Sequence, residues 1–219
     1  MRDHRSAVRC LLGLAVSICL VGCAVSDPTQ YYTLGGAPAS SSSAENVKSG
    51  ANESTTTPQR PVAGTGAVAV GVGPVLVPAY LDRIQIVTRT ATDQVDVSVF
   101  HRWAEPLPDG IARTLAEEIA VGVPTERIVV FPWQGVVARA IQYQVVVAVL
   151  RFDGRPTGNV ALEARWRILG KDGEELTFRR SAVNEVAGGP GYEPMVAAMT
   201  RALATLGQEM AAAIRTVPR

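Results

Sequence analysis

The chain has 219 residues, of which 47% are hydrophobic and 19% are charged, and its formal net charge at pH 7 is +1. Its basic residues, nearly all Arg, are scattered along the sequence, which argues against a nucleic-acid partner and against a general attraction to anionic lipid. The length suits one stable domain rather than two.

The N-terminus has the layout of a bacterial lipoprotein signal peptide. Three arginines precede an apolar stretch from Cys10 to Val21, which is about a dozen residues and falls short of the roughly 20 that span a bilayer. Residues 20–23, Leu-Val-Gly-Cys, then match a lipobox, in which the small Gly22 suits cleavage before Cys23. We expect residues 1–22 to be removed and Cys23 to be acylated; the alternative is an ordinary secretory signal.

Cleavage would leave a nearly neutral mature chain. It removes three Arg and one Asp, so 18 basic and 19 acidic residues remain, and Cys23 is then the sole cysteine. A disulfide within the mature chain is excluded, and the hydrophobic core must stabilise the fold. Ala24 follows the acylated cysteine, where an acidic residue favours inner-membrane retention in many Gram-negative bacteria. We therefore expect the outer membrane, with the domain facing the periplasm.

The next segments differ in composition. Residues 31–34, Tyr-Tyr-Thr-Leu, are β-prone, whereas residues 35–66 are rich in Ser, Thr, Gly, Ala and Pro and lack the large apolar residues that order a chain. The predicted division is a signal peptide (1–22), a lipidated N-terminus with a first strand (23–34), a flexible insert (35–66) and one domain (67–219).

From residue 67 onward the periodicity is mostly that of strands. Asp172-Gly173 suits a tight hairpin turn, so the C-terminal half reads as an antiparallel meander. Tyr143–Phe152 is apolar on both faces and predicts a central strand. The expected strands are Val68–Val77, Ile84–Thr90, Gln94–Trp103, Tyr143–Phe152, Leu162–Ile168 and Glu175–Val186.

The strand Gln94–Trp103 alternates between two kinds of side chain. One face of this strand is expected to join the core because apolar residues recur at every second position. The residues of that face are Val95, Val97, Val99, His101 and Trp103.

Two segments follow the helical period. In the first, an apolar residue recurs every four positions, at Leu107, Ile111, Leu115, Ile119 and Val123. The second has a longer stripe made of Tyr192, Met195, Val196, Met199, Leu203, Leu206, Met210 and Ile214, with Pro194 in its first turn. We expect both stripes to pack on the sheet; the alternative for the second is a lipid- or partner-binding face. The predicted fold class is α+β, a mixed and largely antiparallel sheet of six to seven strands carrying two amphipathic helices.

Several short motifs then follow one another in order. They are the lipobox, Tyr31-Tyr32-Thr33-Leu34, Val72-Gly73-Pro74-Val75, Pro78-Ala79-Tyr80-Leu81-Asp82-Arg83, Gln85-Ile86-Val87-Thr88-Arg89, Arg102-Trp103-Ala104-Glu105-Pro106-Leu107, and Ile111, Arg113, Leu115 and Ala116. In this order they resemble the PqiC-type, or ABC-type transport auxiliary, lipoproteins, over nearly the whole mature chain except the Ser/Thr-rich insert. If residues 31–34 are the first strand, as in that family, the insert is a surface loop and the domain lies close to its membrane.

The resemblance implies a function. Members of that family accompany MCE-domain (MlaD- or PqiB-like) proteins, with ABC permease and ATPase subunits, in moving lipids between the inner and outer membranes. This chain would then be a non-enzymatic adaptor that docks the assembly at the outer membrane and supports membrane integrity. Since MCE proteins form rings, the resemblance also raises the expectation of a homo-oligomer.

Two motifs offer candidate partner-binding residues. They are Tyr80, Leu81, Asp82, Arg83, Arg102, Trp103 and Glu105. In the functional interpretation Tyr80, Leu81, Arg83 and Trp103 form an exposed rim for a partner. In the structural interpretation, which we favour, Pro78 fixes a turn that covers the sheet edge, and Trp103 is buried beside an ion pair between Arg102 and Glu105.

Catalytic chemistry has little support in the sequence. His101 is the sole histidine of the mature chain, so we expect neither a histidine metal cluster nor a cofactor, and we read His101 as a satisfied core residue. No phosphate-binding lysine motif is present, so ATP hydrolysis would belong to another subunit. A carrier that binds lipid in an apolar groove lined by Met195, Met199 and Met210 is the alternative function, and an envelope enzyme using His101 is a weaker third.

Overall fold

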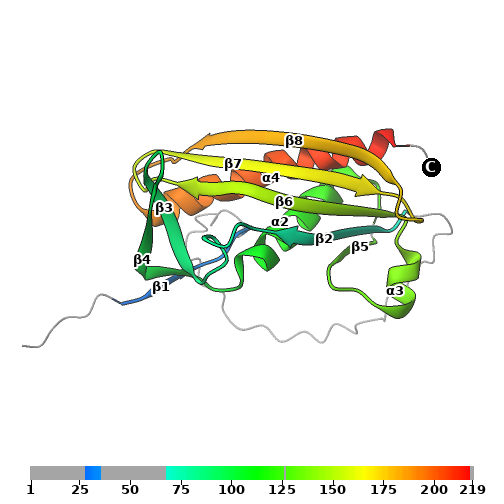
Figure 1. Ribbon diagram of the computed structural model, residues 1–219, viewed down its shortest axis with the longest axis horizontal. Helices are drawn as coiled ribbons and strands as arrows, with labels where there is room; N and C mark the ends of the chain where they lie inside the picture. Colours follow the sequence, from blue (N-terminus) through cyan, green and yellow to red (C-terminus); the bar gives the residue numbers. More distant parts are fainter. Residues whose placement is uncertain (1–27, 36–67, 126, 218–219) are drawn as a thin grey trace, which may run out of the picture.

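Three long strands form an antiparallel meander that makes up most of the sheet (Figure 1). They are β6 (Tyr143–Gly154), β7 (Asn159–Leu169) and β8 (Glu175–Val186). Gly173 adopts a φ of 84° between β7 and β8, a left-handed conformation that glycine takes without steric cost. The predicted meander and its hairpin turn are thereby confirmed.

Five shorter strands complete the sheet in the computed structural model, which describes residues 28–35, 68–125 and 127–217. β2 (Val70–Leu76) runs parallel to both β6 and the short β5 (Ile128–Val130). β3 (Gln85–Ala91) and β4 (Gln94–Trp103) form a hairpin that joins the end of β6 by one parallel pair, Thr88 with Gly154. β1 (Gln30–Tyr32) lies parallel to β4 at the edge.

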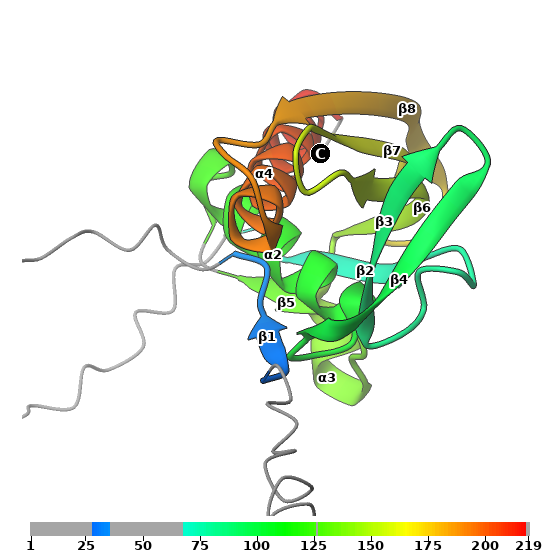
Figure 2. The ribbon, with the colours of Figure 1, turned by 90° about the vertical axis from the view of Figure 1, so that its left-hand side faces the viewer.

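Two helices cover one face of this sheet. α2 (Leu107–Gly122) and α4 (Tyr192–Thr216) lie side by side (Figure 2), with α4 against β6, β7 and β8 and α2 against β2 and β5. Every residue of both predicted stripes is buried except Tyr192, which is half-buried. Both stripes therefore pack in the protein core, as predicted.

Close approach of the two helices depends on two glycines. A Cβ atom built on Gly207 of α4 would lie 2.5 Å from the Cβ of Glu118, and one built on Gly122 of α2 would lie 2.5 Å from the Cβ of Ala211. Both distances are far shorter than van der Waals contact, so α2 and α4 can adopt this separation only with glycine at these positions.

The α+β class and the mixed sheet are confirmed, with differences in detail. The sheet has eight strands among the described residues rather than six to seven, and a short third helix, α3 (Gly135–Ala140), follows β5. β5 has three residues and α3 has six, none of them buried, so neither segment is long enough to show a periodic pattern.

The predicted core face of β4 is wrong in its middle part. Val97 and Val99 are exposed, whereas Ser98 is buried. The pairing with β3 shifts between Val97 and Arg102, and within this bulge the backbone N–H of His101 donates to the Ser98 Oγ at 3.0 Å. A bulge changes the face on which the following side chains lie, so strict alternation fails here.

Several predictions fall outside the described residues. These are the signal peptide, the acylation of Cys23 and the insert from residue 36 onward. Among the residues that the structure describes, no helix combines the length and the apolar character needed to cross a membrane.

Candidate functional site

The predicted turn after Pro78 separates two kinds of residue. The Pro78 carbonyl accepts hydrogen bonds from the backbone N–H groups of Leu81 (2.8 Å) and Asp82 (3.2 Å). Leu81 is buried in the core, whereas Asp82 and Arg83 are exposed. Leu81 thus anchors the turn and contributes no exposed contact surface, while the two charged residues face solvent.

Tyr80 points from the same turn to a buried carboxylate. Its hydroxyl lies 3.4 Å from the Oδ2 of Asp153, a residue of β6 that is fully buried. Two arginines neutralise that carboxylate: Arg89 of β3 donates from Nη2 at 2.8 Å and Arg151 donates from Nε at 3.0 Å. Burial, with the negative charge of Asp153 as the second cause, raises the pKa of Tyr80. The hydrogen bond to Asp153 raises the pKa of Arg89. This network joins β3, β6 and the turn, and it is a structural cluster.

The second motif is arranged differently from the prediction. Trp103 is buried, as the structural interpretation requires. Glu105, however, pairs with Arg113 of α2 at 2.5 Å, and the Arg102 Nε is buried without a hydrogen-bond partner. The predicted ion pair between Arg102 and Glu105 is therefore not formed. Arg113 also donates to the Leu34 carbonyl at 2.8 Å, so the pair joins the segment after β1 to α2.

His101 belongs to an aromatic cluster near the molecular surface. Its ring stacks on Tyr192 with centroids 3.6 Å apart, and its Nδ1 lies 2.8 Å from the Tyr32 hydroxyl. His101 is half-buried, so it is satisfied as predicted but does not lie in the core. Burial and the charge of Glu193 raise the pKa of Tyr32. These aromatic residues line an open depression of about 850 Å³ beside β1 and the N-terminus of α4.

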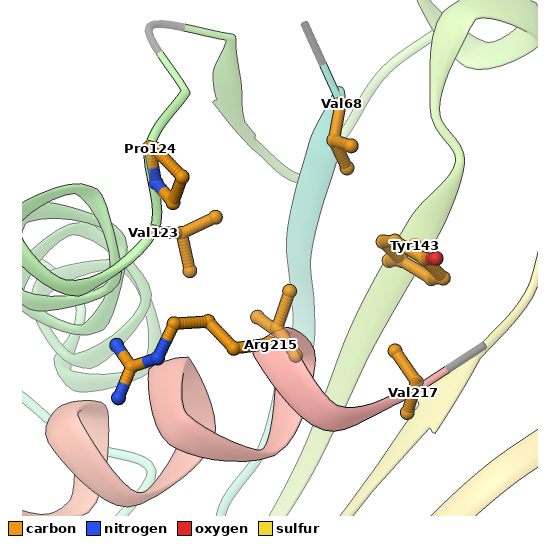
Figure 3. Close-up of a pocket in the computed structure, with 7 residues that line it drawn as sticks. Val68, Val123, Pro124, Tyr143, Arg215 and Val217 are labelled. Atoms are coloured by element: carbon orange, nitrogen blue, oxygen red, sulfur yellow. The ribbon is translucent and has the colours of Figure 1, made fainter. Parts of the chain in front are cut away.

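A smaller pocket of about 300 Å³ lies at the other end of α4 (Figure 3). Among the described lining residues Arg215 is the one that is charged, and its guanidinium donates to the Gly122 carbonyl. The remaining lining residues are Val68, Val123, Pro124, Tyr143, Ile214 and Val217. This volume is at the lower end of the range for small-molecule sites.

The methionine-lined groove of the alternative carrier function is absent from the described part of the chain. Met195, Met199 and Met210 are all at most 1% exposed. They fill the space between the sheet and the two helices, so they pack in the core and line no groove. This agrees with the expectation that the stripe packs on the sheet, and it leaves the carrier alternative without its groove among the described residues.

The described residues also lack a candidate metal site. Within the described ranges, no three His, Cys, Asp or Glu side chains are grouped so that they could hold an ion.

Exposed apolar residues were largely missed by the sequence analysis. Leu76 and Ile84 flank the turn after Pro78, and Phe131, Val136 and Val137 lie around α3. Hydrophobic periodicity identifies the buried face of a helix or strand, but it does not identify single exposed apolar residues in loops and short elements.

One family model matches most of the chain. The model described as "ABC-type transport auxiliary lipoprotein component" matches residues 52–211. No curated protein matches the chain.

Solved structures share the fold. A crystal structure of an uncharacterised protein is 25% identical, with a TM-score of 0.58, and the match covers 67% of this chain and 92% of that one. Protein XCC0632 from Xanthomonas campestris, of the DUF330 family, is 16% identical with a TM-score of 0.54, over 69% of this chain and 85% of that one.

Proposed function

Because the chain belongs to the family of ABC-type transport auxiliary lipoprotein components, we propose that it is the non-enzymatic adaptor of an MCE-type lipid transport system. In this proposal acylated Cys23 anchors the domain of residues 67–219 to the outer membrane, facing the periplasm. The permease and ATPase subunits supply the energy, and an MCE-domain protein is the direct partner. The family match carries the proposal, and the lipobox and Ala24 support its location.

The partner surface that we propose is the connection between β2 and β3. It exposes two apolar residues, Leu76 and Ile84, and two charged ones, Asp82 and Arg83, around the buried anchor Leu81. Interfaces are commonly built from apolar side chains with a polar rim. Of the residues predicted from sequence, Asp82 and Arg83 belong to this surface, and half-buried Tyr80 lies behind it.

Affinity purification tests the proposal directly. Full-length protein with a C-terminal tag is crosslinked gently in membranes, purified, and its partners are identified by mass spectrometry. We expect an MCE-domain protein together with a permease or an ATPase. Recovery of none of these from an abundant, lipidated bait would overturn the adaptor function.

Two variants locate the surface. Ile84→Asp should lower recovery of the MCE-domain protein several-fold because it places a charge in the apolar part of the contact. Val121→Asp, at an 86% exposed position on α2, is the matched control and should leave recovery unchanged. Equal recovery with both variants would place the contact elsewhere on the molecule.

We further propose that the protein forms a homo-oligomer, because its proposed MCE partner is a ring of several copies. Mass photometry of the lipidated protein in detergent measures the number of copies. A single mass equal to one copy at all concentrations would contradict self-assembly while leaving the adaptor function intact.

A further inference from the structure

The end of the molecule that holds β1 carries an aromatic surface that the proposed adaptor function does not use. We name it the β1 surface, and its residues are Gln30, Tyr31, Tyr32, His101, Pro190 and Tyr192. We propose that the β1 surface rests on the headgroup layer of the bilayer that holds the lipid anchor. This inference rests on the proposed acylation of Cys23.

The composition of the β1 surface fits a lipid headgroup layer. Its residues line the depression beside β1, and among the described residues that line it Glu193 is the only Asp, Glu, Lys or Arg. Tyr31 is 63% exposed. Tyrosine rings favour the membrane–water boundary because the ring is apolar and the hydroxyl is polar. Since none of the described residues of this surface is Lys or Arg, its contact should not depend on anionic lipid.

The length of chain before β1 brings this end to the bilayer. Cys23 and Gln30 are seven residues apart, and even a fully extended segment of that length spans at most about 25 Å. A domain of about 150 residues has a diameter near 38 Å. The tether is therefore shorter than the domain, which keeps the β1 end close to the anchor. α3 lies at the opposite end of the sheet (Figure 1).

The side chains of Tyr32, His101 and Tyr192 are held in place before any contact with lipid. The Tyr32 hydroxyl donates to the Gln30 Oε1 at 2.6 Å and lies 2.8 Å from His101. Tyr192 stacks on His101 from the first turn of α4. Fixed side chains lose little conformational entropy on binding, so a surface of this kind adds to membrane contact at low cost.

Fluorescence quenching in reconstituted vesicles tests the inference. The mature chain has Cys23 as its sole cysteine, so one added cysteine in the full lipidated protein carries a single environment-sensitive label. The label is placed by Gln30→Cys on the β1 surface or by Val136→Cys on α3, where Val136 is 75% exposed. The vesicles contain phosphatidylcholine, with or without phosphatidylglycerol, and a quencher attached to the lipid acyl chain.

We expect strong quenching at residue 30, none at residue 136, and no change when phosphatidylglycerol is added. Quenching at neither position, or only at residue 136, overturns the inference. Mass spectrometry of the N-terminal peptide reports acylation separately, so failure of the anchor is distinguished from failure of the surface contact.

A second pair of variants tests the aromatic contribution. Tyr31→Asp should reduce the quenching at residue 30 at least two-fold because it places a charge in the contact. Phe178→Asp is the control, since Phe178 is an aromatic residue on β8 that is 59% exposed. Equal quenching in the two variants would show that the tether alone sets the distance and would overturn the inference.

Discussion

Asp153 is a carboxylate of β6 that the fold buries between two arginines. It is fully buried, and Arg89 and Arg151 both donate to its carboxylate. The motif Gln85–Arg89 showed an arginine but not its partner, because Asp153 lies 64 residues away in the sequence. A buried ion pair between distant strands depends on the fold and has no local pattern.

Replacement of Asp153 by Ala should lower the free energy of unfolding by about 3–5 kcal/mol, since it leaves the mostly buried Arg89 without its counter-charge. Urea denaturation of the mature chain measures this change. Glu163→Ala removes an ion pair whose Arg180 is 59% exposed, and this control should change stability by less than about 1 kcal/mol. Equal losses of unfolding free energy in the two variants would show that the buried pair of Asp153 and Arg89 stabilises the fold no more than an exposed ion pair does.

Tyr80 should make the fold sensitive to alkaline pH. Burial raises its pKa in the folded state, so the unfolded chain, with a tyrosine pKa of about 10, loses the phenolic proton first. The stability that the neutral phenol contributes is therefore complete below about pH 10 and is lost as the pH rises through the folded-state pKa. The stability advantage of the native chain over Tyr80→Phe should be constant below about pH 10 and should shrink as the pH rises above it. Parallel stability curves for the two proteins would contradict this prediction.

At the end of β4, the burial of one residue was predicted correctly but the ion pair beside it was not. Burial of Trp103 was expected from its size and its position at a strand end, and it is confirmed. The partner of Glu105 was wrong because Arg113 lies on the next element, where the first turns of α2 bring it within 2.5 Å. The prediction paired Glu105 with Arg102, its neighbour in the sequence, whereas in the folded chain Glu105 pairs with Arg113.

At the scale of elements, the contact between α2 and α4 is fixed by the small size of two residues. Both helices were predicted from their apolar stripes, yet Gly122 and Gly207 carried no signal for their role. A stripe shows which face is buried but does not show how near the neighbouring helix lies.

Gly207→Ala should destabilise the protein although alanine favours a helix by about 1 kcal/mol over glycine. The added methyl group would lie 2.5 Å from the Glu118 Cβ, so the helices must move apart, which typically costs about 1–3 kcal/mol. Thermal unfolding should show a lower Tm. Gly188→Ala has no atom within 4 Å of the added Cβ and serves as the control. An unchanged or higher Tm for Gly207→Ala would show that the helices adjust freely.

The strand predictions were most accurate where no bulge interrupts the alternation of side chains between the two faces of the strand. β8 begins and ends at the predicted residues, whereas β4 has the right bounds but a wrong face at Val97 and Val99. The reason is the bulge, which depends on pairing with β3 and not on the β4 sequence alone. β5 and α3 were missed because three residues contain less than two periods of a strand and six residues contain less than two turns of a helix.

On the scale of the whole molecule, the arrangement of surfaces follows from the place of β1. β1 pairs with β4 at an edge of the sheet, so the chain leaves the domain at one end, toward Cys23. The β2–β3 connection lies at the same end as β1, since the Ile84 carbonyl accepts from the Trp103 N–H and Trp103 pairs with Tyr32. The apolar residues around α3 lie at the opposite end of the sheet (Figure 1). A short tether would therefore hold β1 and the β2–β3 connection near the bilayer, where a protein partner that reaches the membrane could contact the exposed residues of that connection.

Anchoring should depend on Cys23 alone. Two acyl chains hold a protein on a bilayer stably, whereas one chain binds only marginally, and tyrosine contacts without acyl chains are weaker still. We expect the protein to move from the membrane to the soluble periplasmic fraction when Cys23→Ser is combined with a non-lipoprotein secretory signal in place of residues 1–22. The exchanged signal matters because processing then does not require the thiol. Cys19→Ser, within the native predicted signal peptide, should leave the protein in the membrane fraction. If the Cys23→Ser protein stayed with membranes at high expression, protein or lipid contacts of the domain itself would be sufficient for anchoring, and the lipid on Cys23 would not be the anchor.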